Sequence, residues 1–297
     1  MTPVPAVRDR VLGTEVLVAG VPSAAQAAAL AALHRVEAVF SRFRPGSDLC
    51  RVNAAGGVPV RVAPVFAAAL ADACAHAAAT GGVFSPLLGR EVAATGYAVD
   101  LAEVPGRPSA APPPAVTAPR VRIDHGSGTV AVPPGVALDL GGFVKGWAVQ
   151  RVADELRAGG APRGLVDAGG DVACWTDGEP WRVGVARPGT DARVLRLHGR
   201  AAVATGSTAH RAWRDADGAP QHHVIDPRTG RPCRSGWVRV TTWQAGEGAD
   251  LGALEAAATA LLVLGPEQGP PLLAARYPDA SWLAVDPAGA TTTGGVR

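Results

Sequence analysis

The sequence of 297 residues predicts an α+β fold. Segments that alternate like strands and Ala-rich segments that resemble helices are mixed along the chain, without the strict strand–helix alternation of a parallel α/β sheet. Glycine and proline separate most of these segments and mark the turns between them. The length fits one large domain or two of ordinary size, and we expect one integrated domain with two lobes over residues 1–297.

The N-terminal part predicts two strands and two helices. Residues 11–20 alternate well enough for a first strand, and Ser23 with Gln26 forms a capping box that opens a helix ending near Phe40. Residues 40–57 carry turn residues and are expected to form a loop. A short strand at 58–64 leads to an Ala-rich helix at 64–79, where Pro64 suits the first turn and Gly81-Gly82 ends it.

The remaining elements follow the same signals. The Pro-rich segment 104–119 predicts an irregular surface excursion. A hairpin turning at Gly126-Ser127-Gly128 precedes a strand that ends at Asp139 and a helix from about Lys145 to Leu156. Further strands are expected at 163–175, 181–188, 192–199, 201–207, 238–245 and 282–287, with a loop at 222–232 and a helix at 250–264 that Gly265-Pro266 closes.

Composition excludes several classes of protein. The net charge is only +2 and no basic run occurs, so nucleic acid is not expected as a partner. No apolar run is long enough to cross a membrane, and the N-terminus does not resemble a signal peptide. The four cysteines show no CxxC spacing, which favours buried, reduced thiols. We therefore expect a cytoplasmic protein.

Lys145 is the only lysine in the chain, beside 27 arginines. Asn53 is likewise the only asparagine. Both amino acids are encoded by A- or T-rich codons, so both are expected to be scarce in a protein from a GC-rich genome. A lysine that persists under such pressure is a candidate for a position where its chemistry matters, although chance also leaves survivors.

The stretch Asp139-Leu-Gly-Gly142 joins a predicted strand to a predicted helix. Glycines there allow a ligand to approach the backbone, and the free N–H groups of a helix start favour an anion such as a phosphate. Lys145 lies in the first turn, where a cation opposes the helix dipole. This placement is unfavourable unless an anion is bound nearby. The alternative is a tight turn with a solvated lysine. Neither GxGxxG nor GxxxxGK[ST] occurs, which excludes Rossmann and P-loop interpretations.

Two further stretches carry potential chemistry. Glu255 and Thr259 stand at i and i+4 on one face of an apolar helix, where a carboxylate and a hydroxyl could hold Mg²⁺. The alternative is a surface Glu beside a Thr bonded to its own backbone. In His222-His223-Val-Ile-Asp226-Pro-Arg-Thr-Gly230, a turn holds an imidazole near a carboxylate, which fits a general base or a purely structural turn.

The order of these stretches is more specific than any one of them. LGTEV, FSRFRPGSDLCRVNA, GGVFSP, LDLGGFVKGWAVQRVADEL, LVDAGGDV, AVATGS, HHVIDPRTGRP and EAAATALLVLGP follow one another from about Leu12 to the C-terminus. In this order they resemble the ApbE family, the FAD:protein FMN transferases.

The resemblance implies an α+β fold with FAD in a cleft between two lobes. It implies a Mg²⁺-dependent transfer of FMN from FAD to a Thr or Ser hydroxyl of a target protein, with release of AMP. It makes His223 the catalytic residue. The implied flavin and FAD contacts are Leu12, Phe43, Val83, Phe84, Ser85, Asp139 and Lys145. The implied Mg²⁺ ligands are the Gly142 carbonyl, Glu255 and Thr259.

Two residues depart from the family pattern. Glu255 replaces the usual metal Asp and is one methylene longer, and Ser85 replaces an Asp and removes a carboxylate from the cleft. Asp250 is a candidate for a further metal oxygen. These departures leave two alternatives open: an FAD-binding protein without transfer activity, and an FAD pyrophosphatase that yields FMN and AMP. The family's acceptor motif is not evident in this chain, so the acceptor is expected to be another protein.

Overall fold

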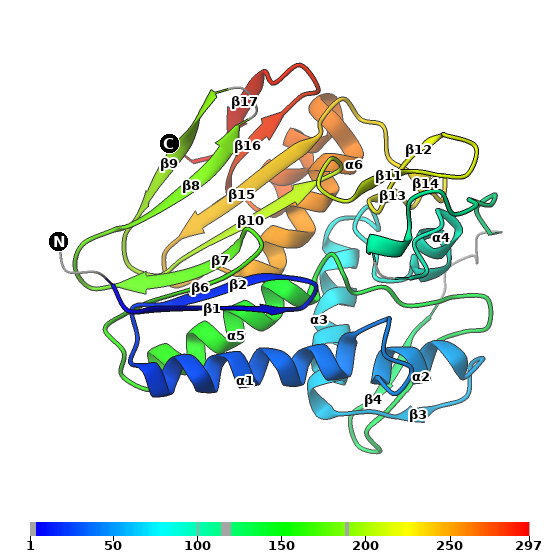
Figure 1. Cartoon of the computed structure of the whole chain (residues 1–297), viewed down its shortest axis with the longest axis horizontal. Coiled ribbons are helices and arrows are strands. Elements are labelled where there is room, and N and C mark those ends of the chain that lie inside the picture. Colours follow the sequence, from blue (N-terminus) through cyan, green and yellow to red (C-terminus); the bar gives the residue numbers. More distant parts are fainter. Residues whose placement is uncertain (1–3, 100, 114–119, 188–189, 297) are drawn as a thin grey trace.

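The computed structural model describes residues 4–99, 101–113, 120–187 and 190–296, and it confirms the predicted α+β class (Figure 1). Its centre is an eight-stranded sheet in the order β1-β2-β6-β7-β10-β15-β16-β17, in which all neighbouring strands are antiparallel. The strands are β1 (Ala6–Val11), β2 (Thr14–Ala19), β6 (Arg163–Ala168), β7 (Asp171–Thr176), β10 (Ala201–Ser207), β15 (Arg239–Ala245), β16 (Ser281–Val285) and β17 (Thr291–Gly294).

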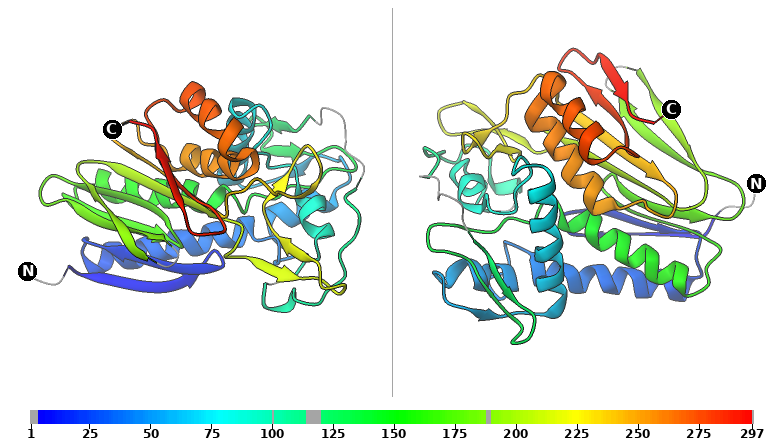
Figure 2. Two further views of the ribbon diagram at one scale, coloured as in Figure 1. Left: turned by 90° about the horizontal axis from the view of Figure 1, so that it is seen from above. Right: turned by 180° about the vertical axis from the view of Figure 1, so that it is seen from behind.

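Three long helices cover one face of this sheet, as the view from behind shows (Figure 2, right). They are α1 (Ser23–Phe40), α5 (Val144–Ala158) and α6 (Leu251–Arg276). Because side chains alternate along a strand, Ala173 and Trp175 of β7 join the core beneath the helices, together with Leu33, Val149 and Leu254. This core holds the start of α5 and the middle of α6 close to each other.

The opposite face of the sheet is covered by a hairpin of β8 (Trp181–Arg187) and β9 (Thr190–Leu197). Val172 and Cys174, the alternate residues of β7, pack there with Val185, Leu195 and Leu197 in a separate apolar cluster. The sheet is therefore buried on both faces, which explains why all six residues of β7 are buried.

A second group of elements, mostly short apart from α3, lies beyond the ends of α1 and α5 (Figure 1). It comprises α2 (Asp48–Ala54), α3 (Pro64–Ala79), α4 (Gly89–Ala94), a 3₁₀ turn η1 (Leu101–Glu103), β3 (Val60–Arg61), β4 (Arg122–Asp124), β5 (Thr129–Ala131), β11 (Ala212–Arg214), β12 (Pro220–His222), β13 (Ile225–Asp226) and β14 (Arg231–Pro232). β3, β5 and β4 form a three-stranded sheet, and the last four strands form two short hairpins.

Several predicted elements need correction. No strand ends at Asp139, since the chain there makes only one isolated bridge, from Ala137 to Leu88. The predicted capping box is wrong, because Pro22 is the N-cap of α1 and Ser23 already lies inside the helix. The predicted loop at 40–57 contains α2, whose N-cap Ser47 accepts a hydrogen bond from the Cys50 backbone.

Longer segments were also divided or extended relative to the prediction. Residues 163–175 form two strands, β6 and β7, which turn at Gly169-Gly170, both with positive φ. The helix predicted at 250–264 ends as expected at Gly265, whose φ of 72° is not helical, and α6 joins it to a second helical segment up to Arg276 that was not predicted. The edge strands β1 and β17 were not predicted. Of the predicted Pro-rich excursion, residues 104–113 are irregular and 114–119 lie outside the described residues.

Two other sequence expectations can be compared with the fold. The four cysteines are free thiols, and Cys174 and Cys233 are buried. Among the described residues, no helix combines the length and the apolar character that crossing a membrane requires.

Candidate functional site

A cavity of about 530 Å³ gathers residues from distant parts of the chain. Its wall includes ten of the eleven residues predicted for the site, from the β1–β2 turn to α6. These ten are Leu12, Phe43, Val83, Phe84, Ser85, Asp139, Gly142, Lys145, His223 and Thr259. The eleventh, Glu255, is buried next to the cavity and bonds to Lys145, which is on the wall.

The β1–β2 turn presents Leu12 to the cavity in an unusual conformation. Leu12 has a φ of 58°, the only positive φ of a non-glycine residue in the described segments. Its backbone N–H donates to Glu37 Oε1 at 2.8 Å, which holds the turn against α1. Leu12 and Gly13 are the two residues of this hairpin turn, and both have the positive φ that such a turn requires.

One end of the cavity is aromatic. Phe43 and Tyr97 lie on its wall with ring centroids 6.1 Å apart, and the guanidinium of Arg42 lies 3.8 Å from the Tyr97 centroid and 4.8 Å from that of Phe43. Arg42 Nη1 donates to Asp139 Oδ2 at 2.7 Å. Asp139 Oδ1 accepts from the Gly141 backbone at 2.7 Å, so this carboxylate is fixed from two sides.

The segment after α3 forms another part of the wall. Thr80, at the end of α3, accepts a hydrogen bond from the Phe84 backbone at 3.2 Å and so fixes the path of residues 83–85. Phe84 is buried and its ring lies 5.9 Å from that of Phe143, at the entry of α5. Ser85 Oγ accepts from the Leu87 backbone at 3.2 Å. Ser85 is thus engaged in the local turn.

Lys145 joins the start of α5 to β7 and α6. Its ammonium forms an ion pair with Asp171 and lies 2.9 Å from Glu255 Oε1. Burial alone would lower the pKa of this ammonium, but the charges of Asp171 and Glu255 outweigh it and hold the pKa of Lys145 above its usual range. Lys145 is therefore charged, and it is held in place from two elements.

Glu255 is enclosed by α5. Its Oε2 accepts from the Gly146 backbone at 3.0 Å, and a Cβ on Gly146 would lie only 2.8 Å from the same oxygen. Burial is the largest effect on its carboxyl and, with the charge of Asp171, raises the pKa of Glu255 to about 7 although Lys145 opposes the shift. Lys145 alone therefore does not offset the burial of Glu255 and the charge of Asp171, and a further cation beside Glu255 would favour its ionised form.

The oxygen donors beside this cluster fit a hard cation. Thr259 Oγ1 lies on the cavity wall, 3.9 Å from the position that a Cβ on Gly142 would occupy. In the described parts of the chain, no three His, Cys, Asp or Glu side chains converge to hold a metal. A metal there would depend on the Thr259 hydroxyl, the Gly142 carbonyl and Glu255, which suits Mg²⁺ because it keeps several waters and takes oxygen ligands.

His223 lies on the wall at the β12–β13 connection. Its Nδ1 lies 3.4 Å from the Arg211 carbonyl oxygen, so Nδ1 carries the proton and donates, and the lone pair is on Nε2. Burial and the charge of Arg211 lower the pKa of His223 to about 3. The neighbouring His222 has a different position, because its ring bonds to the Cys233 carbonyl at 3.0 Å and to the Val224 N–H at 3.3 Å.

Sequence reasoning missed four residues that the structure places at or beside this cavity. Asp171 pairs with Lys145, Arg42 pairs with Asp139, and Tyr97 and Arg211 lie on the wall. Asp171 was within a stretch, LVDAGGDV, that already contributed to the resemblance, and its carboxylate after two glycines was a usable signal. Arg42 also lies in such a stretch, FSRFRPGSDLCRVNA, directly before Phe43, but nothing in the sequence indicated its pairing with Asp139.

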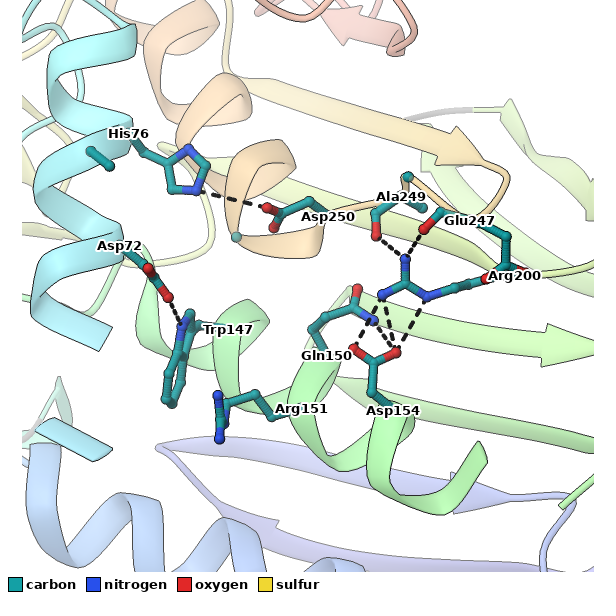
Figure 3. A pocket seen from close by; sticks show the side chains of 13 residues that line it. Asp72, His76, Trp147, Gln150, Arg151, Asp154, Arg200, Glu247, Ala249 and Asp250 are labelled. Atoms are coloured by element: carbon teal, nitrogen blue, oxygen red, sulfur yellow. Dashed lines mark hydrogen bonds and ion pairs between the residues drawn. The ribbon is translucent and has the colours of Figure 1, made fainter. Parts of the chain in front are cut away.

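Asp250 is not at this cavity, so the prediction of a metal oxygen there is wrong. It caps α6 by accepting from the Ala253 backbone at 3.1 Å, and it lines a second cavity of about 420 Å³ (Figure 3). In that cavity Asp250 lies 3.9 Å from His76, and Arg200 pairs with Asp154. Its polar groups bond largely to one another, and the predicted site residues other than Asp250 lie elsewhere.

Comparison with known proteins identifies the family. The model of the ApbE family matches residues 12–283, which is most of the chain. The chain belongs to the ApbE family. A protein of Treponema pallidum named FAD:protein FMN transferase is 32% identical over 284 residues, covering 86% of this chain and 75% of its own. A Rhodobacter capsulatus protein of the same name is 34% identical and covers 89% of this chain.

Some of these matches cover only about half of the relative's length. The Rhodobacter match covers 52% of that protein, and a 34% identical match to a Vibrio cholerae FAD:protein FMN transferase covers 41% of its length. Among solved structures, the ApbE protein of Thermotoga maritima has a TM-score of 0.84 at 27% identity, with 98% of this chain and 96% of that chain covered. The Pseudomonas stutzeri flavinyl transferase ApbE has a TM-score of 0.79 at 23% identity, and supports the fold.

Proposed function

We propose that the protein transfers the FMN moiety of FAD to a Thr or Ser hydroxyl of a separate acceptor protein and releases AMP. The observation that carries this proposal is the composition of the 530 Å³ cavity, which has aromatic rings at Phe43 and Tyr97 and an unprotonated ring nitrogen at His223. Relatives over most of the chain are named FAD:protein FMN transferase, and this supports the same assignment.

His223 would accept the proton of the attacking hydroxyl. Because Nδ1–H donates to the Arg211 carbonyl, Nε2 is the nitrogen that can accept. The hydroxyl oxygen attacks the phosphorus of the FMN half, the bond from that phosphorus to the oxygen of AMP breaks, and the proton passes to Nε2. The pKa of about 3 keeps the imidazole neutral before FAD binds, and the negative charge of a bound pyrophosphate would raise this pKa.

Lys145 and its partners would serve the phosphate end of the site. The Lys145 ammonium, which Asp171 and Glu255 hold in position on the cavity wall, would donate a hydrogen bond to a pyrophosphate oxygen once a cation offsets the two carboxylates. Mg²⁺, held by Thr259, the Gly142 carbonyl and Glu255, would supply positive charge that stabilises the leaving AMP. Glu255 has both oxygens engaged by Lys145 and Gly146, so the lysine and the metal would share one carboxylate.

The experiment is a transfer assay with FAD, Mg²⁺ and a peptide that carries the family's acceptor sequence, Asp-x-x-Ser/Thr-Gly-Ala-Ser/Thr. A peptide that gains FMN, with AMP released, supports the transferase. Free FMN and AMP without labelled peptide would favour the pyrophosphatase, and FAD binding without AMP would favour a flavin-binding protein. The cytoplasmic location stays a prediction.

A further inference from the structure

One polar group in the aromatic end of the cavity has no partner. Arg42 Nη1 bonds to Asp139, but Nη2 is buried and makes no hydrogen bond to any described residue. A buried guanidinium nitrogen without an acceptor costs the full desolvation of its N–H groups, which folded proteins generally avoid. The expected acceptor is therefore an atom of the ligand that fills this cavity.

The surroundings of Arg42 indicate which part of a ligand lies there. Its guanidinium lies over the ring of Tyr97 at 3.8 Å and near that of Phe43 at 4.8 Å, which is a setting for a flat aromatic ligand. The Asp139 carboxylate, 2.7 Å away, balances the positive charge. The guanidinium is thus held through Nη1, and its free Nη2 can donate to a neutral acceptor such as a ring carbonyl.

We propose that Arg42 is a specificity residue for the flavin ring: Nη2 donates a hydrogen bond to a carbonyl oxygen of the isoalloxazine. This inference rests on the proposed function, because it takes the flavin to be the group bound at the aromatic end. Arg42 would thus distinguish a flavin from an adenine, which has no ring carbonyl. Asp139 keeps the guanidinium in the required orientation through Nη1.

The test compares the binding of three ligands by the wild type and by Arg42→Lys. Lysine keeps the charge and can pair with Asp139, but it has no second planar nitrogen. Riboflavin contains the ring without phosphate, ADP contains phosphates without the ring, and FAD contains both. We expect the affinity for riboflavin and FAD to fall about 10- to 100-fold and the affinity for ADP to stay within about twofold. The absorption spectrum of bound riboflavin should also change, since a ring carbonyl loses its donor.

Two controls keep the result interpretable. Arg51→Lys makes the same exchange in α2, where Arg51 is exposed and pairs with Asp48 outside the cavity, and it should bind all three ligands like the wild type. Arg42→Met removes the donor and the charge, and it should lose riboflavin at least as strongly as Arg42→Lys. The melting temperatures of all variants show whether they are folded.

The outcomes separate this inference from the proposed function. A wild type that binds no FAD would overturn both. A wild type that binds FAD, with an Arg42→Lys variant that binds riboflavin equally well and with an unchanged spectrum, would overturn the role of Arg42 alone. A variant that loses ADP but keeps riboflavin would place Arg42 at the phosphates and would also overturn it.

Discussion

Lys145 and Glu255 are 110 residues apart in the chain, yet Nζ of the lysine lies 2.9 Å from Oε1 of the glutamate. The contact joins the first turn of α5 to the middle of α6, and the ion pair of Lys145 with Asp171 adds the start of β7. A compact ammonium between two buried carboxylates gives a physical reason for a lysine in a chain whose other 27 Lys and Arg residues are arginines.

The first prediction is that Lys145→Arg impairs transfer. A planar guanidinium is wider than an ammonium and must fit beside Gly146, where even a Cβ would lie 2.8 Å from Glu255 Oε2. A shift of about 1 Å in a reacting group can lower the rate about 100-fold, so we expect a loss of that order in kcat. Steady-state kinetics of Lys145→Arg and Lys145→Ala check this. An arginine variant with wild-type kinetics would show that only the charge matters.

Gly146 provides a second prediction, about stability. Its missing side chain allows α5 and α6 to approach, because a Cβ would also lie 3.1 Å from Leu251 Cγ. Gly146→Ala should therefore lower the free energy of unfolding by about 1–3 kcal/mol, as overpacking does. Gly178→Ala is the matched control, since nothing lies within 4 Å of a Cβ there. Urea denaturation measures the free energy of unfolding of both variants. Equal stability of the two would contradict the close packing at Gly146.

The two neighbouring histidines should differ in what they do. His223→Gln should lower kcat about 10²- to 10⁴-fold, the usual contribution of a general base, while FAD binding remains. His222 bonds to the backbone at Cys233 and Val224, so His222→Gln should lower the melting temperature and largely keep transfer. Measurements of kcat and of the melting temperature for both variants test this difference. Equal rate losses at the two positions would argue against His223 as the base.

The pKa of His223 gives a prediction about pH. Its folded pKa of about 3 lies below the ordinary value of about 6.5, so between these values the unfolded chain binds more protons than the folded one. His223 therefore favours unfolding as the pH falls from about 6.5 towards 3, and His223→Gln should lose less stability than the wild type over that range. Urea denaturation at several pH values measures this. NMR signals of His223 that titrate near pH 6.5 in the ligand-free protein would contradict the buried, neutral imidazole.

Glu255 gives a prediction about the metal. Glu255→Gln keeps the shape and an acceptor for Lys145 but removes the charge that would help hold Mg²⁺. Transfer by this variant should require at least about tenfold more Mg²⁺, while FAD affinity measured without the metal changes much less. A matched change, Asp154→Asn, lies in the second cavity and not in the 530 Å³ cavity, and it should leave both values unaltered. An unchanged Mg²⁺ requirement in Glu255→Gln would place the metal on other oxygens.

Local patterns predicted the helices better than the strands. The bounds of α1 and α3 agree with the prediction because Ala-rich periodicity and Pro64 act within a few residues. The edge strands β1 and β17 pair with the strands next to them in the chain, β2 and β16, and were missed all the same. Other strand partners are distant in the chain: β2 pairs with β6, and β7 pairs with β10. The strand expected before Asp139 failed for the same reason, because Leu138 bonds to the Asn53 side chain and has no ladder to join.

Much of the candidate site could be predicted because the family's stretches are contiguous in the sequence. Most of the predicted residues indeed line one cavity. Sequence spacing put Glu255 and Thr259 on one helical face, but it could not show that both oxygens of Glu255 are engaged by α5. Arg42 lies in the stretch FSRFRPGSDLCRVNA, but its place in the site was not predicted, because Asp139 and Tyr97, which it contacts, are distant in the chain.

The most direct test of the account is the stoichiometry of the transfer reaction. Purified protein is incubated with FAD, Mg²⁺ and the acceptor peptide, and mass spectrometry of the peptide is combined with a measurement of AMP. The account predicts one FMN bound to the Thr or Ser of the peptide for each AMP released, with neither product formed by His223→Gln at a comparable rate. AMP released together with free FMN, and a peptide that stays unmodified, would contradict it.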